Sequence, residues 1–159
     1  MRIPMKQVAY FMGTVPVNFF GNVQYHTELR QPYRSLRLEL AYMDNKPDIP
    51  GDLLSQSITD AYLEYHGQPL DDASLPEIYA HMKTEIQLTA LLDGEFAGTI
   101  HRPGTHKEIL ITPSEQTPGC VYPKNQLYPG TLQGHLTVIV NFFGVLVEQT
   151  PYSLTVYAE

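Results

Sequence analysis

Hydrophobic and polar residues alternate along several stretches of the chain, as they do in strands with one buried face. The clearest stretch covers residues 33–42, where Leu36, Leu38, Leu40 and Tyr42 alternate with small, polar or charged residues. A leucine face opposite a charged face predicts a strand of an antiparallel sheet that packs on one side. Weaker runs predict strands at 7–12, 15–19, 85–90, 95–100, 107–112, 135–143, 145–149 and 152–157. The expected core comprises Leu36, Leu38, Leu40, Leu88, Val138, Val140, Leu154 and Val156.

The spacing of apolar residues becomes helical in the middle of the chain. Asp52 precedes the first such run as the expected N-cap, and Gly67 follows it as the expected stop. Ser74 precedes Pro76 and Glu77 with the spacing of a capping box, so a second helix is expected to begin there and end near residue 83 or 84. The inward-facing positions would be Leu54, Ile58, Ala61, Tyr62 and Tyr65 in the first helix and Ile78, Tyr79 and Met82 in the second.

The composition favours one mainly β domain. The chain has 159 residues, 43% hydrophobic and only 17% charged, with 13 prolines and 11 glycines. These proportions indicate strands joined by many turns rather than a helical bundle. Asp93-Gly94 is a strong hairpin signal, and residues 113–130, rich in proline, predict a long irregular loop. We therefore predict a single antiparallel β-sandwich, jelly-roll-like, over residues 1–159, with a short two-helix insertion at 52–84.

One short sequence occurs twice. Residues 15–21 read VPVNFFG and residues 138–144 read VIVNFFG, so six of the seven positions are identical. One interpretation is that two similar hairpins, related by pseudo-symmetry, open and close the domain. The other is convergence, because aromatic strand ends followed by glycine are common.

Charge and cysteine content exclude several functions. The net charge is −7, and residues 51–100 alone carry nine acids against one lysine, Lys83. We expect no nucleic-acid partner, because Arg30, Arg34 and Arg37 are too few to offset this charge. Cys120 is the single cysteine, so neither an intramolecular disulfide nor a zinc site of several thiolates can form.

The expected location follows from the absence of targeting signals in the sequence. The N-terminal residues contain no continuous apolar stretch, and no window is long enough to span a bilayer. We therefore expect a cytoplasmic protein without a membrane partner. A secreted protein that had lost its leader would have the same features.

Histidines and a glutamate suggest a metal site. His101, His106 and Glu108 lie near a predicted turn, and His135 lies on a later strand. This set resembles the metal sites of cupins, in which His, His and Glu from one segment meet a later His, although the two histidines here are five residues apart rather than two. The resemblance implies that His106, Glu108 and His135 would be ligands. Solvated loop histidines are the alternative, and His135 shares its strand face with Thr137, which points the ring outward.

A second candidate site is a binding surface on the proline-rich loop. The chain has 11 tyrosines and no tryptophan, and tyrosine provides amphipathic contact area. Tyr122, Lys124, Asn125 and Tyr128 lie together in this loop and are the candidate ligand-binding residues. Tyrosines that simply pack at strand ends are the alternative interpretation.

The functional prediction rests on this loop and on the lack of known catalytic motifs. Nucleophile-elbow, P-loop and dinucleotide-binding motifs do not occur. We predict a non-enzymatic binding or assembly module that presents loops or a sheet edge to a protein or small-molecule ligand, without a cofactor, and that could self-associate as a homo-oligomer. The alternative is a metal-dependent enzyme of small β-barrel, cupin-like type. A structural subunit of a larger assembly is a third class.

Overall fold

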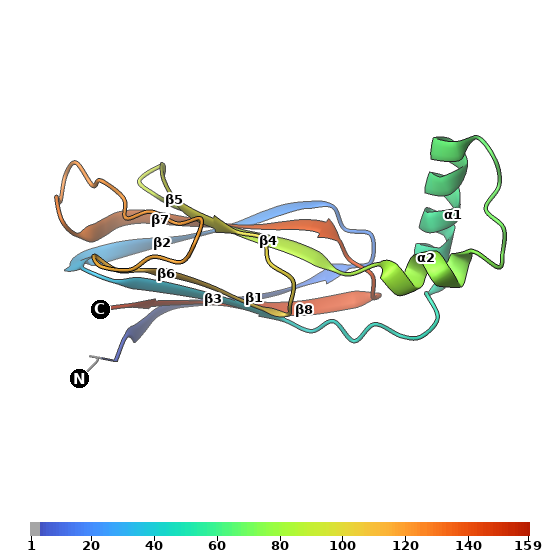
Figure 1. Ribbon diagram of the computed structural model, residues 1–159. Coiled ribbons are helices and arrows are strands. Elements are labelled where there is room, and N and C mark those ends of the chain that lie inside the picture. The colour runs from blue at the N-terminus through green and yellow to red at the C-terminus, as the bar shows by residue number, and fades with distance from the viewer. Residues whose placement is uncertain (1–3) are drawn as a thin grey trace.

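Two four-stranded antiparallel sheets pack face to face in the computed structural model, which describes residues 4–159 (Figure 1). One sheet has the order β1 (Lys6–Pro16), β8 (Gln149–Ala158), β3 (Leu36–Tyr42) and β6 (His106–Ile111). The other has the order β2 (Gly21–Tyr33), β7 (Leu132–Gly144), β4 (Glu85–Leu92) and β5 (Glu95–Ile100). The chain passes between the sheets in the manner of a jelly roll. The predicted antiparallel, jelly-roll-like sandwich is confirmed.

The core lies between the sheets, on the face that the alternation predicts. Leu38 and Leu40 of β3 are completely buried, while Arg37 and Glu39 on the other face form an ion pair with 3.3 Å between Nε and Oε1. All eight residues expected in the core are buried: Leu36, Leu38, Leu40, Leu88, Val138, Val140, Leu154 and Val156. The period of two therefore identified which face of each of these strands packs inward.

Two tyrosines connect the sheets through the core. The hydroxyl groups of Tyr25 on β2 and Tyr152 on β8 lie 2.6 Å apart. Burial and this hydrogen bond raise the pKa of Tyr152 well above its ordinary value. Gly13 on β1 provides the space for this contact, because a Cβ atom there would lie 2.5 Å from the Tyr152 hydroxyl oxygen. Each hydroxyl of this partly buried pair thus has a hydrogen-bond partner between the sheets.

The strand prediction missed one strand and extended two others into turns. β2 was not predicted, although Val23, Tyr25 and Leu29 alternate with polar residues along it. The strand predicted at 15–19 is wrong in its second half, because β1 ends at Pro16 and Asn18 adopts a positive φ of 67° in the turn. The strand predicted at 145–149 is also wrong, since β8 begins only at Gln149 and the preceding residues form the turn after β7.

The repeated VxVNFFG sequence does not repeat a backbone structure. Residues 15–21 form the end of β1, a turn and the first residue of β2, whereas residues 138–144 lie entirely within β7. The two segments are neighbours, with the rings of Phe19 and Phe142 5.4 Å apart and those of Phe20 and Phe143 6.2 Å apart. The pseudo-symmetric hairpin interpretation is therefore wrong.

Two helices lie between β3 and β4, within the region predicted for the insertion, and project from one end of the sandwich (Figure 1). α1 covers Asp52–His66 and α2 covers Leu75–His81. The N-cap of α1 is Gly51 rather than Asp52, whose carboxylate lies in the first turn, where it complements the helix dipole. Ser74 occupies the predicted N-cap position of α2 but makes no side-chain capping bond. Gly67 ends α1 as predicted, with φ of 70° and its N–H donating to the Leu63 carbonyl at 2.8 Å.

A small apolar cluster holds the helices to the sandwich. It joins Leu54 and Ile58 of α1 to Tyr79 of α2 and to Leu146 from the turn before β8. The second half of α1 makes no such contact: Ala61 is exposed and Tyr65 is 86% exposed, which contradicts their predicted inward orientation. The helical spacing of apolar residues in α1 continues into its second half, although the sandwich provides no surface there for them to pack against. None of the helices in residues 4–159 is long and apolar enough to cross a membrane.

A lysine ties the segment after β3 to the end of α2. The Lys46 ammonium donates to the carbonyl oxygens of Tyr79 and Met82 at 2.6 and 2.8 Å and lies 4.3 Å from the centre of the Tyr79 ring. A cation suits this position because the last carbonyls of a helix lack intrahelical partners and carry partial negative charge. The contact fixes the start of the segment that leads into β4.

Replacing Leu38 by Ala tests the orientation of β3. Loss of a fully buried leucine should lower the free energy of unfolding by about 2–5 kcal/mol in urea melts. Leu110→Ala, on the outer face of the neighbouring strand, is the matched control and should cost clearly less, since Leu110 is only partly buried. Equal losses from the two variants would contradict the assigned faces.

Candidate functional site

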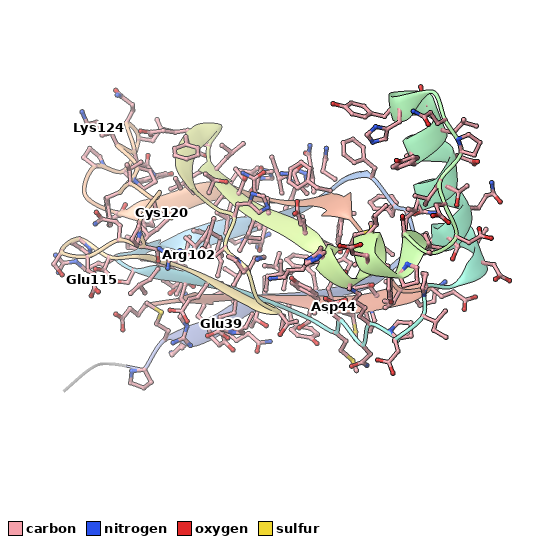
Figure 2. The ribbon with its side chains drawn as sticks, turned by 45° about the vertical axis from the view of Figure 1, so that its right-hand side comes forward. Glu39, Asp44, Arg102, Glu115, Cys120 and Lys124 are labelled. Carbon is pink, nitrogen blue, oxygen red and sulfur yellow. The ribbon has the colours of Figure 1, made fainter. Side chains whose placement is uncertain are left out.

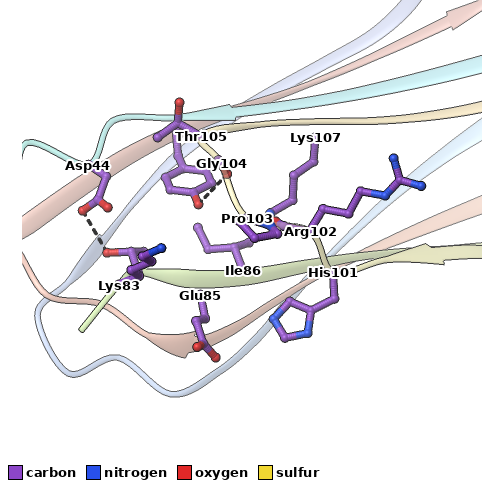
Figure 3. Close-up of a pocket in the computed structure, with 12 residues that line it drawn as sticks. Asp44, Lys83, Glu85, Ile86, His101, Arg102, Pro103, Gly104, Thr105 and Lys107 are labelled. Atoms are coloured by element: carbon purple, nitrogen blue, oxygen red, sulfur yellow. Dashed lines mark hydrogen bonds between the residues drawn. The ribbon is translucent and has the colours of Figure 1, made fainter. Parts of the chain in front are cut away.

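A cavity of about 500 Å³ opens at the helix-bearing end of the sandwich (Figure 3). Three segments distant in sequence form its wall: the end of β3, the start of β4 and the connection between β5 and β6. The lining residues are Tyr42, Asp44, Lys83, Thr84, Glu85, Ile86, His101, Arg102, Pro103, Gly104, Thr105 and Lys107. Its volume is typical of sites for small molecules.

Lys107 is the unusual residue of this pocket. It points inward from β6 together with Ile109 and Ile111, and only 3% of its surface is exposed. Its ammonium donates to the Arg102 carbonyl oxygen and lies 6.0 Å from the centre of the Tyr42 ring. The ion pairs found within residues 4–159 do not include Lys107. Burial lowers the pKa of Lys107, because a charged ammonium loses hydration there without gaining a carboxylate partner.

Hydrogen bonds fix the shape of the pocket before any ligand enters. The Tyr42 hydroxyl donates to the Gly104 carbonyl oxygen at 2.8 Å, and the Thr84 hydroxyl donates to Asp44 Oδ1 at 3.0 Å; both bonds are drawn in Figure 3. Burial, with a smaller contribution from the charge of Asp44, raises the pKa of Tyr42. Tyr42 therefore remains a neutral donor at physiological pH. These bonds join the three segments into one wall.

The pocket combines an apolar wall with an ammonium at its inner side. Ile86 is completely buried and the Tyr42 ring nearly so, whereas His101, Arg102 and Glu85 are exposed at the rim. The Arg102 guanidinium points away from Lys107, so only its backbone carbonyl contacts the ammonium (Figure 3). This arrangement offers a ligand one buried positive charge and an apolar surface, while the other two cationic lining residues, Lys83 and Arg102, are exposed to solvent.

The residues predicted to bind a metal are not brought together. His106 and Glu108 lie on the exposed face of β6, whereas His135 lies on β7 of the other sheet. The expectation that His135 points outward is confirmed, since 43% of its side chain is exposed. Between residues 4 and 159, no three His, Cys, Asp or Glu side chains have the geometry of a metal site. A cupin-like metal site would need all three ligands on the same face of one sheet. His106, Glu108 and His135 lie on two different sheets and so cannot form it.

The proline-rich loop lies at the end of the sandwich opposite the helices (Figure 2). Two of its four predicted ligand-binding residues have side-chain bonds, one within the loop and one to the turn between β2 and β3. The Tyr122 hydroxyl donates to the Arg34 carbonyl at 3.0 Å, and Asn125 Oδ1 accepts the backbone N–H groups of Leu127 and Tyr128 at 3.1 and 3.0 Å. Lys124 and Tyr128 are exposed. Lys124 and Asn125 line a hollow of about 320 Å³, which Tyr122 and Tyr128 do not reach.

The sequence did contain a signal for Lys107. In β6 it occupies the same face as Ile109 and Ile111, which alternation places in the core. A lysine in a buried register is rare and demands an explanation. The contributions of Tyr42, Thr84 and the 101–105 connection had no such signal, because their proximity arises only from the tertiary fold.

Comparison with known proteins gives a family but no activity. A family model described as "Family of unknown function (DUF6669)" matches residues 5–159. No curated protein matches the chain.

Replacing Lys107 by Met tests whether the buried ammonium destabilises the fold. Met retains most of the apolar stem, so the variant should be about 1–2 kcal/mol more stable than the original at pH 7. Because the folded chain releases the Lys107 proton at a lower pH than the unfolded chain does, the original should gain stability as pH rises toward the ordinary lysine pKa of 10.5. The difference measured by urea melts should therefore shrink as the pH is raised toward that value.

Lys124→Met is the matched control, since Lys124 is exposed and its replacement should change stability by less than about 0.5 kcal/mol at every pH. A Lys107→Met variant that is less stable at pH 7, or a difference independent of pH, would show that the ammonium is well solvated.

Proposed function

We propose that this chain, which belongs to DUF6669, a family of unknown function, is a non-enzymatic binding module whose pocket takes a small organic carboxylate with an apolar body. The observation that carries this proposal is the buried Lys107 ammonium, which lines the cavity and has a carbonyl but no carboxylate as its partner. The 101–105 connection borders the pocket, so this proposal places ligand binding at a loop, although not at the proline-rich loop predicted from the sequence.

Charge complementarity supports a carboxylate. A buried charge without a counterion is costly, and an entering anion would return part of that cost as binding energy. Lys107 is the single buried cation of the pocket, since Lys83 and Arg102 in its lining are exposed to solvent. One buried ammonium suits one carboxylate better than a phosphate, which is commonly bound by several cations or a series of backbone N–H groups. Asp44 and Glu85 near the opening would further disfavour a multiply charged anion.

The hydrogen bonds in the pocket support binding rather than catalysis. The Tyr42 hydroxyl and the Lys107 ammonium both donate to backbone carbonyls of residues 102–104. In these roles they shape a rigid cavity, and rigidity lowers the entropy lost when a ligand binds.

Thermal unfolding in the presence of benzoate tests the proposal. Benzoate should raise Tm in a concentration-dependent manner, since a ligand that binds only the folded chain stabilises it by mass action. Uncharged benzamide, which has the same shape, should have little effect. Lys107→Met should abolish the benzoate shift, and Lys124→Met should retain it. Equal shifts with benzamide, or an unchanged shift in Lys107→Met, would contradict recognition by the ammonium.

A second candidate function, assembly through a sheet edge, is favoured by the exposed side of β1. Within residues 4–159, β1 pairs with β8 alone, so its other edge carries free backbone groups. Tyr10 and Met12 on this strand are 50% and 71% exposed. Natural edge strands are usually protected by charges, proline or bulges. In β1, Lys6 and the bulge between Gln7 and Ala9 lie at the beginning and Pro16 lies at the end, so residues 9–15 have none of these protections.

Light scattering tests the assembly function. If β1 mediates self-association, the chain should have at least twice the mass of a monomer at micromolar concentration, and Met12→Lys should reduce it to the monomer mass. Glu108→Lys, at the exposed face of the opposite edge strand, is the control and should leave the mass unchanged. A monomeric original chain would remove this function while leaving the pocket unaffected.

A further inference from the structure

Two histidines from different strands face each other on the outer side of the second sheet. His26 on β2 and His135 on β7 lie 109 residues apart in sequence, yet 2.8 Å separates His26 Nδ1 from His135 Nε2. His26 is exposed and 43% of the His135 side chain is exposed, so solvent reaches the pair. The pair lies outside the pocket, and neither of its members lines that cavity.

Neighbouring carboxylates hold His135 in place. Glu28 bonds His135 Nδ1, and Asp93 Oδ1 accepts the His135 backbone N–H at 2.8 Å. With its Nδ1 proton donated to Glu28, His135 presents a lone pair on Nε2 toward His26. A carboxylate that orients the far nitrogen of an imidazole in this way is the usual support of a metal-binding histidine.

We propose that His26 Nδ1 and His135 Nε2 bind one Cu²⁺ ion, with Glu28 as the positioning residue for His135. Imidazole nitrogens suit the later divalent transition metals, and Cu²⁺ binds such donors most tightly in that series. Water would occupy the remaining coordination positions on the open face. The site is independent of the carboxylate pocket.

The spacing of the two nitrogens would favour Cu²⁺ over Zn²⁺ if ring rotation preserves it. With metal–nitrogen bonds of about 2.0–2.1 Å, nitrogens separated by 2.8 Å subtend about 85–90° at the metal. That is the angle between adjacent ligands of a tetragonal Cu²⁺ site, whereas tetrahedral Zn²⁺ requires the nitrogens to move apart. Each ring must rotate enough to turn its lone pair from the other ring toward a common point. Exposure of the pair leaves room for that rotation.

Cu²⁺ binding through His26 Nδ1 requires that nitrogen to be free of a proton. In this arrangement the tautomer of His26 with its proton on Nδ1 would donate to a free His135 Nε2. Coordination through Nδ1 would place that proton on His26 Nε2 by a change of tautomer. The Thr137 hydroxyl, 3.2 Å from His26 Nδ1, is positioned to hydrogen-bond a metal-bound water.

Titration calorimetry with CuCl₂, in a buffer containing glycine as a weak competing ligand, tests the site on the full chain. We expect one Cu²⁺ per chain and an affinity at least tenfold lower in His26→Gln and in His135→Gln. Electron paramagnetic resonance of the loaded chain should show two imidazole nitrogens, and one in either variant. Because both histidines are surface residues, circular dichroism should confirm that the variants remain folded.

Glu28→Gln separates positioning from coordination. It should weaken Cu²⁺ binding about 10-fold to 100-fold while preserving the two-nitrogen signature, since Glu28 acts through His135. His66→Gln and His106→Gln, which change exposed histidines elsewhere, should bind Cu²⁺ as the original chain does. Full Cu²⁺ affinity in His26→Gln or His135→Gln, equal losses in the control variants, or tighter binding of Zn²⁺ than of Cu²⁺ would overturn the proposal.

Discussion

The packing of two apolar sheet faces against each other is the constraint from which the rest of this structure follows. Each strand contributes every second residue to the shared layer, so a slip of one residue would exchange leucines such as Leu38 for charged neighbours such as Glu39. The same register fixes every outward residue. Among the buried residues of the described chain, Lys107 is the one that carries a charge, and it lies where the apolar layer reaches the helix-bearing end. The proposed pocket therefore lies at the edge of the core, and its buried charge belongs to the same layer as the core leucines.

Features that depend on local chemistry could be predicted from the sequence. The face of β3, the Asp93-Gly94 hairpin and the stop at Gly67 all follow from residues close together in the chain, and the structure confirms them. Predictions failed where tertiary packing decides the outcome. Residues 145–149 have the alternation of a strand, but Leu146 instead packs against α1 and α2. Tyr65 continues the helical period of Leu54 and Ile58 but has no surface to cover it.

The candidate sites were harder to predict from the sequence than the fold, because each site joins segments that are distant in sequence. Tyr42 and Gly104 meet only because β3 and β6 are neighbours, and His26 and His135 meet only because β2 pairs with β7. Histidine content suggested metal chemistry, and strand alternation correctly directed His135 outward. Neither signal could identify the residues that contact His135, because the alternation within one strand does not show which strand pairs with it. The burial of Lys107 is the exception, because alternation within the six residues of β6 could have predicted it, although Lys107 was not among the residues expected in the core.

Jelly rolls serve unrelated functions, so the architecture does not select one for this chain. The two proposed sites differ in what they demand of the fold. The Lys107 ammonium is held within the apolar layer, where we expect it to oppose stability, a common feature of residues kept for function. His26 and His135 lie on the solvent side, where a hydrogen-bonded pair is compatible with stable packing beneath it. A stability cost is therefore evidence for function at Lys107 but not at the histidine pair, where only the carboxylate-held geometry distinguishes a site from an ordinary polar surface.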